Sequence, residues 1–171
     1  ATNKQKELDC FNNVLAKVKS DGGNIQYGWI IWEWPNLFLE AEFHAVWITP
    51  DGNYMDITPR QINIPQILFL PDDENIYSGN QVESKFHRLS EKREVKIYID
   101  LMRERFNILN KEKYKNKRKI ILDQIDEMLY QNVTTSINAT ARAMLKIRVA
   151  PEEECPCQSG TLYRECCMQL E

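Results

Sequence analysis

Four of the five cysteines in this chain lie close together, at Cys155, Cys157, Cys166 and Cys167. Their order is Cys-x-Cys, then eight residues, then Cys-Cys. Zinc takes four thiolates in tetrahedral geometry, and two close pairs joined by a turn supply them. Disulfides would be spread over the elements that they join, and adjacent cysteines pair with difficulty. We therefore predict a structural Zn²⁺ site, which supplies the folding free energy that so short a segment lacks.

The fifth cysteine, Cys10, stands alone and directly follows Asp9, a residue type that often begins a helix. In the first turn of a helix, the backbone N–H groups and the helix dipole favour a thiolate. The same N–H groups can hold an oxyanion during acyl transfer. The position of Cys10 therefore predicts a nucleophile, which needs a base and a group that orients the base.

A base and its orienting group are available on two neighbouring predicted strands. His44, one of two histidines, precedes a Pro-Asp-Gly turn, and Asp56 follows it. If this turn is of type I, Thr49 pairs with Asn53. Asp56 then lies opposite Val46, on the sheet face that also carries His44. This register predicts that the two side chains meet, whereas a shift of one residue would separate them.

Each of these three residues also has an ordinary structural explanation. A thiol at a helix start can be a small, semi-buried residue, and a strand histidine can be hydrogen-bonded in place. Asp56 can cap the chain near Thr58-Pro59. Chain order, turn chemistry and sheet face nevertheless agree, so we keep the triad as a hypothesis beside the structural explanation.

The elements that would position these residues follow from hydrophobic spacing and from turn residues. Apolar residues at helical spacing predict a helix over residues 9–21, which ends at Gly22-Gly23. Residues rich in Ile, Trp and Tyr predict strands. The predicted strands cover 24–34, 37–49 and 53–58, with a short edge segment within 61–70. An apolar stripe from Val95 to Leu109 predicts a helix, and two more helices are predicted over 117–131 and 134–148.

The expected fold class is α+β, with a helix packed on a small antiparallel sheet, followed by helices and a C-terminal zinc knuckle. The expected domains are an α+β domain over residues 1–89, a helical extension over 90–150 and the knuckle over 151–171. An acidic stretch, Pro151-Glu152-Glu153-Glu154, precedes the cysteine cluster. No internal repeat is present.

The composition limits the classes of function. The chain has 171 residues, of which 43% are hydrophobic and 27% charged, a normal globular balance. A net charge of -3 provides no global basic field for nucleic acid. No apolar run reaches the ~20 residues of a membrane span, and the polar N-terminal residues do not resemble a signal peptide. We therefore expect a cytoplasmic protein without a membrane partner.

The cysteine cluster resembles the SEC-C motif, the zinc-binding tail known from the bacterial preprotein translocase ATPase. The matching residues are Cys155, Pro156, Cys157, Ser159, Gly160, Tyr163, Cys166 and Cys167. The resemblance implies a zinc site in which the protein fills all four positions. It also implies a role in binding a protein partner.

The front of the chain resembles the transglutaminase-like branch of the papain-like cysteine enzymes. The matching segments are Cys10 with Gly22-Gly23, then His44-Ala45-Val46-Trp47, then Asp56-Ile57-Thr58-Pro59. The resemblance implies Cys10 as nucleophile, His44 as general base and acid, and Asp56 as the orienting group. It also implies acyl chemistry on an amide or thioester, and leaves hydrolysis, deamidation and transfer to an amine open.

The sequence leaves three hypotheses for the function of the protein. The leading hypothesis is a cysteine-dependent acyl hydrolase or transferase that acts on a peptide or protein amide, with the knuckle recruiting a protein. The alternative is a non-enzymatic adaptor that binds proteins through both parts. A third, weaker hypothesis is an RNA- or ribosome-associated module that uses the basic run from Lys111 to Lys119, for which a solvated helix connection is the favoured explanation.

Overall fold

The computed structural model describes residues 9–60, 64–115, 120–148, 150–155 and 159–170. Within these ranges, the side chains of residues 147, 148, 167 and 170 are not described. The chain forms two compact units. Unit 1 comprises Ala1–Glu33 with Leu39–Phe86, and unit 2 comprises Trp34–Phe38 with His87–Glu171.

Unit 1 begins with the predicted helix, α1 (Cys10–Asp21), which ends at Gly22 with a φ of 78°. This left-handed conformation costs a glycine little. The following Gly23 also has a positive φ, and a Cβ there would lie only 2.1 Å from the carbonyl oxygen of Ile48. The two glycines therefore let the chain turn closely from α1 into the sheet, as the sequence predicts.

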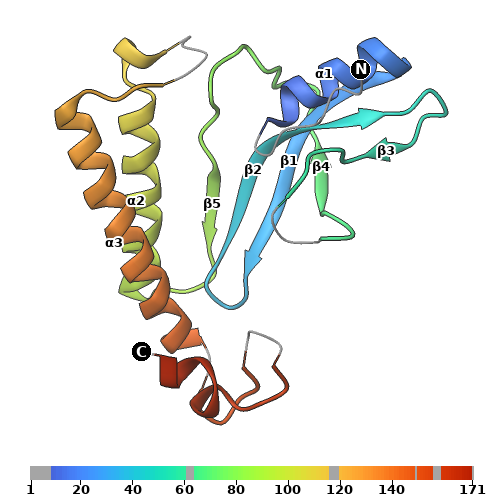
Figure 1. The fold of residues 1–171 in the computed structure, drawn as a ribbon. Coiled ribbons are helices and arrows are strands. Elements are labelled where there is room, and N and C mark those ends of the chain that lie inside the picture. Colours follow the sequence, from blue (N-terminus) through green and yellow to red (C-terminus); the bar gives the residue numbers. More distant parts are fainter. Residues whose placement is uncertain (1–8, 61–63, 116–119, 149, 156–158, 171) are drawn as a thin grey trace. The chain divides into compact units, whose positions relative to one another are not determined.

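A five-stranded antiparallel sheet follows, and its order confirms the predicted meander. The two long strands are β1 (Asn24–Trp34) and β2 (Phe38–Ile48), and they lie side by side in Figure 1. The short strands are β3 (Tyr54–Met55), β4 (Phe69–Pro71) and β5 (Lys85–Arg88). The main order is β3-β2-β1-β4, and β5 pairs with β2.

The hairpin between β2 and β3 has the register that the turn residues predict. Trp47 pairs with Met55, and the backbone N–H of Thr49 donates to the carbonyl of Asn53 at 2.9 Å. The third strand is shorter than expected, because it covers two residues instead of the predicted 53–58. Asp56 nevertheless follows directly after β3, and the register places it opposite Val46 of β2.

The sheet is curled, so that its two outer strands approach each other over one face. The rings of Tyr54 on β3 and Phe69 on β4 contact edge to face, with centroids 6.3 Å apart. A Cβ on Gly28 of β1 would lie 2.6 Å from the Phe69 ring, a distance that real Cβ contacts do not reach. Gly28 therefore gives Phe69 the room that it needs to fold over the sheet.

A small core joins α1 to the sheet. Val14 and Ala45 are fully buried, and Trp47 packs against them. The Trp47 indole N–H donates to the carbonyl oxygen of Gly22 at 2.9 Å, which fixes the end of the helix against β2. Burial of these apolar side chains holds the start of α1, and hence Cys10, in a defined place beside β2.

Unit 2 contains two helices that run side by side, α2 (Arg93–Leu109) and α3 (Gln124–Arg148) (Figure 1). The prediction of two separate helices over 117–131 and 134–148 is wrong, because α3 is continuous through this region. Asn132, Val133 and Thr134 are weak helix formers, but none of them is a helix breaker. Val133 and Ile137 are buried, so tertiary packing maintains the helix where local propensity is low.

The sequence analysis also missed β5 (Lys85–Arg88), whose short polar strand carries no strong alternation. The coarse expectation of an α+β fold is confirmed, since the described part of the chain contains three α-helices and a curled antiparallel sheet. No helix of the described residues is long and apolar enough to cross a membrane.

Candidate functional site

Cys10 is the first residue of α1, and only 8% of its surface is exposed. Asp9 occupies the N-cap position, but its side chain makes no capping hydrogen bond. Instead, one carboxylate oxygen accepts from the Asn12 side chain at 2.6 Å. The first-turn N–H groups are therefore not used by the expected cap, and they lie beside the thiol, where a negative charge is favoured.

The structure brings His44 together with both of the other predicted triad residues. His44 lies on β2 with 4% of its surface exposed, and its Nε2 is 3.0 Å from Oδ1 of Asp56. The Cys10 side chain is its second hydrogen-bond partner. Since Asp56 engages Nε2, Nδ1 is the ring nitrogen that remains for the thiol.

The pKa of His44 records these contacts. Burial of the ring disfavours the imidazolium and by itself would lower the pKa. Hydrogen bonds to Asp56 and to Cys10, together with the negative charge on each, outweigh burial and raise the pKa of His44 to about 9. At neutral pH the ring is therefore an imidazolium that can donate from both nitrogens.

Asp56 is held by three groups at once. Besides His44, it accepts from the backbone N–H of Thr58 at 3.1 Å and from the guanidinium of Arg60. Burial by itself would raise the pKa of Asp56, but the hydrogen bonds from these three groups lower it below its ordinary value. Asp56 is therefore a fixed anion, which suits a group that orients and charges an imidazole.

Arg60 is the site residue that the sequence reasoning missed. It lies four residues after Asp56, forms an ion pair with it, and its guanidinium carbon lies 5.9 Å from the centroid of the Trp32 ring. The only sequence signal was a basic residue shortly after the predicted aspartate, in a segment with no regular structure. Trp32 also donates its indole N–H to the carboxylate of Glu42 at 2.8 Å.

An aromatic pair borders the thiol. Phe11, the residue after Cys10, stacks face to face on Tyr77, with centroids 3.8 Å apart and ring planes within 5°. Burial first, and then the negative charges of Cys10 and Asp9, raise the pKa of Tyr77. Tyr77 therefore lies close enough to Cys10 for the charge of Cys10 to affect its pKa, although Tyr77 belongs to the long segment between β4 and β5.

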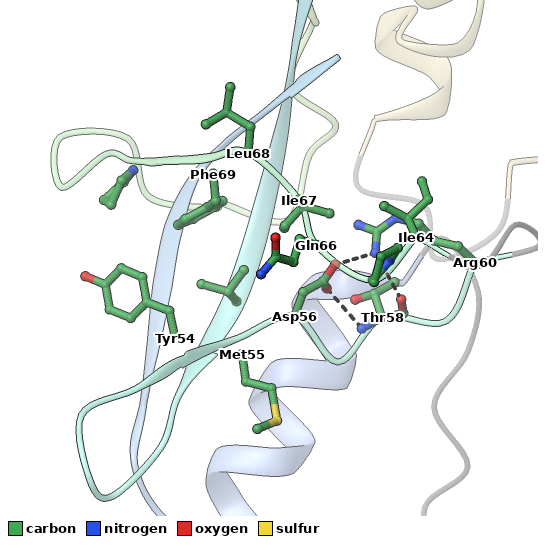
Figure 2. Close-up of a pocket in the computed structure, with 13 residues that line it drawn as sticks. Tyr54, Met55, Asp56, Thr58, Arg60, Ile64, Gln66, Ile67, Leu68 and Phe69 are labelled. Carbon is green, nitrogen blue, oxygen red and sulfur yellow. Dashed lines mark hydrogen bonds and ion pairs between the residues drawn. The ribbon is translucent and has the colours of Figure 1, made fainter. Parts of the chain in front are cut away.

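Asp56 is one of the residues that line a groove of about 920 Å³. Figure 2 shows Tyr54 and Phe69 towards one end of this groove, Asp56 and Gln66 in its middle, and Arg60 and Ile64 towards the other end. Apart from Asp56 and Arg60, the described side chains that line it are apolar or neutral. The groove has the size of a ligand site and is continuous with the carboxylate that holds His44.

The C-terminal cysteines lie in a separate segment of unit 2. Cys155 is buried against Tyr163, and Cys166 packs against the same pair. A backbone turn brings the two halves together, since the N–H of Cys155 donates to the carbonyl of Thr161 at 2.8 Å. Cys157 lies outside the described residues, and the side chain of Cys167 is not described.

The two described thiols of the C-terminal cluster, Cys155 and Cys166, have surroundings compatible with a metal site. Cys155 and Cys166 carry thiols rather than disulfides, and the turn between them brings them into one small cluster. Ser159 donates to the Cys166 sulfur at 3.3 Å, as a hydroxyl does next to a metal thiolate. Among the described residues no group of three or more ligand side chains is assembled, since only half of the predicted set is described.

The other sequence features have structural roles. Trp29 and Trp47 are both buried. In the basic run, Lys111 and Lys113 both pair with the buried carboxylate of Asp126 on α3. Tyr114 also donates to Asp126, at 2.9 Å. The described part of this run therefore stabilises the start of α3 through its contacts with Asp126.

Comparison with known proteins gives one match. The family model for the SEC-C motif matches residues 153–169, which include all four clustered cysteines. No curated protein and no solved structure matches the chain. The match supports the expected SEC-C motif and covers only the end of unit 2, so the function of unit 1 has to be argued from its own site.

Proposed function

We propose that unit 1 is a cysteine-dependent acyl hydrolase or transferase with the transglutaminase-like, papain-like site that the sequence resembles. Cys10 is the nucleophile, His44 the general base and acid, and Asp56 the orienting group. The observation that carries this proposal is the position of the His44 ring. It hydrogen-bonds the thiol of a helix N-terminus and, through Nε2, a fixed carboxylate at 3.0 Å. This arrangement is the one that activates a cysteine.

The steps follow from these contacts. The Cys10 thiolate attacks the carbonyl carbon of an amide, and the first-turn N–H groups of α1 stabilise the oxyanion. The carbon–nitrogen bond breaks, the imidazolium of His44 gives its proton to the leaving amine, and a thioester remains on Cys10. Neutral His44 then takes a proton from water or from an acceptor amine as that nucleophile attacks the thioester. The carbon–sulfur bond breaks, and the thiolate and imidazolium are restored.

Asp56 orients the His44 ring throughout this cycle. Its carboxylate holds Nε2 of His44, so Nδ1 stays directed at the sulfur, and its charge stabilises the imidazolium. Arg60 and the Thr58 amide hold the carboxylate in turn. Fixing the orienting group in this way reduces the rotation that the triad would lose on reaching the transition state.

For the C-terminal segment, we propose that Cys155, Cys157, Cys166 and Cys167 hold one structural zinc ion. The SEC-C match over residues 153–169 and the cluster of Cys155, Cys166 and Tyr163 support this assignment. A bound zinc ion would fold the segment and leave no open position for catalysis. The knuckle then presents a rigid surface for a protein partner. If unit 1 has no activity, this segment supports the adaptor function.

The alkylation rate of Cys10 by iodoacetamide tests the enzymatic proposal. An ordinary thiol with a pKa of ~8.5 is less than 1% thiolate at pH 6, so it reacts slowly. A thiolate paired with the His44 imidazolium reacts at least ~10-fold faster at that pH, even though the nucleophilicity of a low-pKa thiol is reduced. We therefore expect His44→Ala to slow alkylation of Cys10 at pH 6 at least ~10-fold, as followed by mass spectrometry of the Cys10 peptide.

The chain offers a matched control, because His87 is its other histidine and is exposed. His87→Ala should leave the alkylation rate unchanged. Equal alkylation rates in the native chain and in His44→Ala, at every pH between 5 and 8, would contradict the catalytic pair. The adaptor function would then be the better explanation of the chain.

A further inference from the structure

Arg60 shares the carboxylate of Asp56 with His44. Its guanidinium pairs with Oδ2 of Asp56, while Oδ1 of the same carboxylate lies 3.0 Å from Nε2 of His44. Figure 2 shows the contact between Arg60 and Asp56 as a dashed line. A positive charge beside one oxygen reduces the negative potential that the carboxylate exerts on the ring beside the other oxygen.

Contacts with the sheet and with the neighbouring chain hold Arg60 in this position. Its guanidinium carbon lies 5.9 Å from the centroid of the Trp32 ring on β1, within the range of a cation–π contact. The indole N–H of Trp32 donates to the carboxylate of Glu42 on β2 at 2.8 Å, which fixes the ring. Arg60 also donates to the carbonyl oxygen of Thr58 at 3.4 Å. Only 21% of the Arg60 side chain is exposed, so solvent screens its charge less than that of a surface arginine.

The charged groups near His44 lie on three segments of unit 1. Burial lowers the pKa of His44, and contacts with Asp56 after β3 and with Cys10 on α1 raise it. Burial raises the pKa of Asp56, and hydrogen bonds from His44 and then from Arg60 lower it. Glu42 lies on the same strand as His44, and its carboxylate accepts from Trp32. Arg60 therefore acts on the imidazole through Asp56.

The two halves of the proposed reaction make opposite demands on His44. While Cys10 is a thiolate, two negative charges favour the imidazolium, which has to give a proton to the leaving amine. Once the thioester has formed, the charge on the sulfur is gone and Asp56 is the anionic partner that remains. The ring must now be neutral to take a proton from water or from an amine. A carboxylate whose charge is not offset would keep the ring protonated at this stage.

We propose that Arg60 is a positioning residue of this reaction, which offsets part of the charge that Asp56 directs at His44 and so lets the ring act as a base on the thioester. Trp32 holds the guanidinium in the place where it has this effect. The inference rests on the proposed function, because only a reacting His44 has to change its protonation state in each cycle. The charge balance itself requires no reaction at Cys10.

The titration of His44 by NMR in the full-length Cys10→Ser variant tests the proposal, because a serine hydroxyl is uncharged, as is the sulfur of a thioester. Adding Arg60→Gln should raise the pKa of His44 by ~0.5 or more, since glutamine removes the charge and retains a donor for Asp56. Adding Arg60→Lys should leave the pKa of His44 close to its value with Arg60, because lysine retains the charge.

Lys85→Gln is the matched control in the same Cys10→Ser chain. The Lys85 ammonium also lies over a tryptophan of β1, 4.1 Å from the centroid of the Trp29 ring, and Lys85 belongs to unit 1. This substitution therefore removes the same charge from a similar setting, and it should change the pKa of His44 much less than Arg60→Gln does. Circular dichroism verifies the fold of each variant.

Variants of Trp32 provide a second test that leaves Arg60 in the chain. Trp32→Leu removes the aromatic face that holds the guanidinium, so it should also raise the pKa of His44. Trp32→Phe retains an aromatic face and should have a smaller effect.

The possible outcomes separate this inference from the proposed function. A pKa of His44 that is unchanged or lowered in both Arg60→Gln and Trp32→Leu would overturn the role of Arg60. Equal effects of Arg60→Gln and Lys85→Gln would also overturn it. A raised pKa together with an unreactive Cys10 would reject the enzyme and, with it, the role of Arg60 in a reaction. A reactive Cys10 with an unchanged pKa would leave the enzyme and reject the role of Arg60.

Discussion

At the scale of single residues, the proposed chemistry of unit 1 depends on the charges of four neighbouring side chains. Asp56 accepts from both His44 and Arg60, and His44 also contacts Cys10. In the proposed thiolate–imidazolium pair, two anions face two cations in a partly buried cluster. Such a cluster is stable only as a whole, because removing one partner leaves an uncompensated charge.

The raised pKa of His44 makes the stability of unit 1 depend on pH. A histidine whose pKa is about 9 in the folded chain and near 6.5 when unfolded stabilises the fold fully below pH 6.5. This contribution is lost as the pH rises from 6.5 to about 9. One pKa unit corresponds to about 1.4 kcal/mol, so the loss amounts to a few kcal/mol at most.

Urea unfolding of the native chain and of His44→Gln at several pH values checks this expectation. The stability difference in favour of the native chain should be largest near pH 6 and should shrink steadily towards pH 9. The lowered pKa of Asp56 has the opposite sense, since its contribution is present above pH 3.8 and is lost only in acid. A difference that grows between pH 6.5 and 9 would contradict the assignment of an imidazolium in the folded chain.

Tyr77 stacks on Phe11, the residue that follows Cys10. We expect Tyr77→Ala to increase the alkylation rate of Cys10 by iodoacetamide several-fold, because it removes the ring that covers the neighbour of a thiol only 8% exposed. Tyr77→Phe preserves the stacked ring and should react like the native chain. An unchanged rate in Tyr77→Ala would show that other groups cover Cys10.

At the scale of elements, the front of the fold follows from local signals. The bounds of α1 and β1 could be predicted from apolar spacing, the double glycine and a run of aromatic and β-branched residues. The register of β2 and β3 was also predictable, since a tight turn between them fixes it. The proximity of His44 and Asp56 follows from that register, because only twelve residues separate them.

Other elements depend on contacts that are distant in sequence. Tyr77 reaches the site from a long segment without regular structure, and nothing near it in sequence indicates Phe11 as its partner. Arg60 is positioned by its ion pair rather than by an element. β5 is a polar strand that exists through its pairing with β2. Composition and periodicity contain none of these long-range contacts.

The continuity of α3 is a direct test at this scale. If residues 131–134 were a linker, a proline there would be tolerated, whereas inside a helix it costs ~3 kcal/mol or more. Asn132 is exposed on α3, so Asn132→Pro should lower the free energy of unfolding by about that amount. Asn132→Ala should leave it unchanged or slightly raise it. Equal stabilities of the two variants would contradict the single helix.

At the scale of the whole molecule, the chain combines two units with different proposed tasks. Unit 1 contains the thiol, the imidazole and the groove, and unit 2 contains the helical pair and the SEC-C segment. The segment around Cys155 has a very small core of its own. Its order is therefore expected to depend on the metal, whereas unit 1 has an independent apolar core around Val14, Ala45 and Trp47.

Removal of the metal should therefore affect the two units differently. We expect one zinc ion per chain by metal analysis, and loss of that ion in Cys155→Ser. Chelation should make the four clustered cysteines reactive towards a thiol reagent while the alkylation rate of Cys10 stays the same. A purified chain without zinc, or a Cys10 rate that falls with chelation, would contradict this division of tasks.

The titration of His44 tests the central claim most directly, since the chain has only two histidines and their ring protons can be resolved by NMR. We predict that His44 titrates with a pKa of about 9 in the native chain and that Cys10→Ser lowers this value, because contact with Cys10 is one of the two contacts that raise it. His87, exposed and far along the chain, serves as the internal reference. A pKa of His44 near 6.5 that does not respond to Cys10→Ser would contradict the paired thiolate and imidazolium.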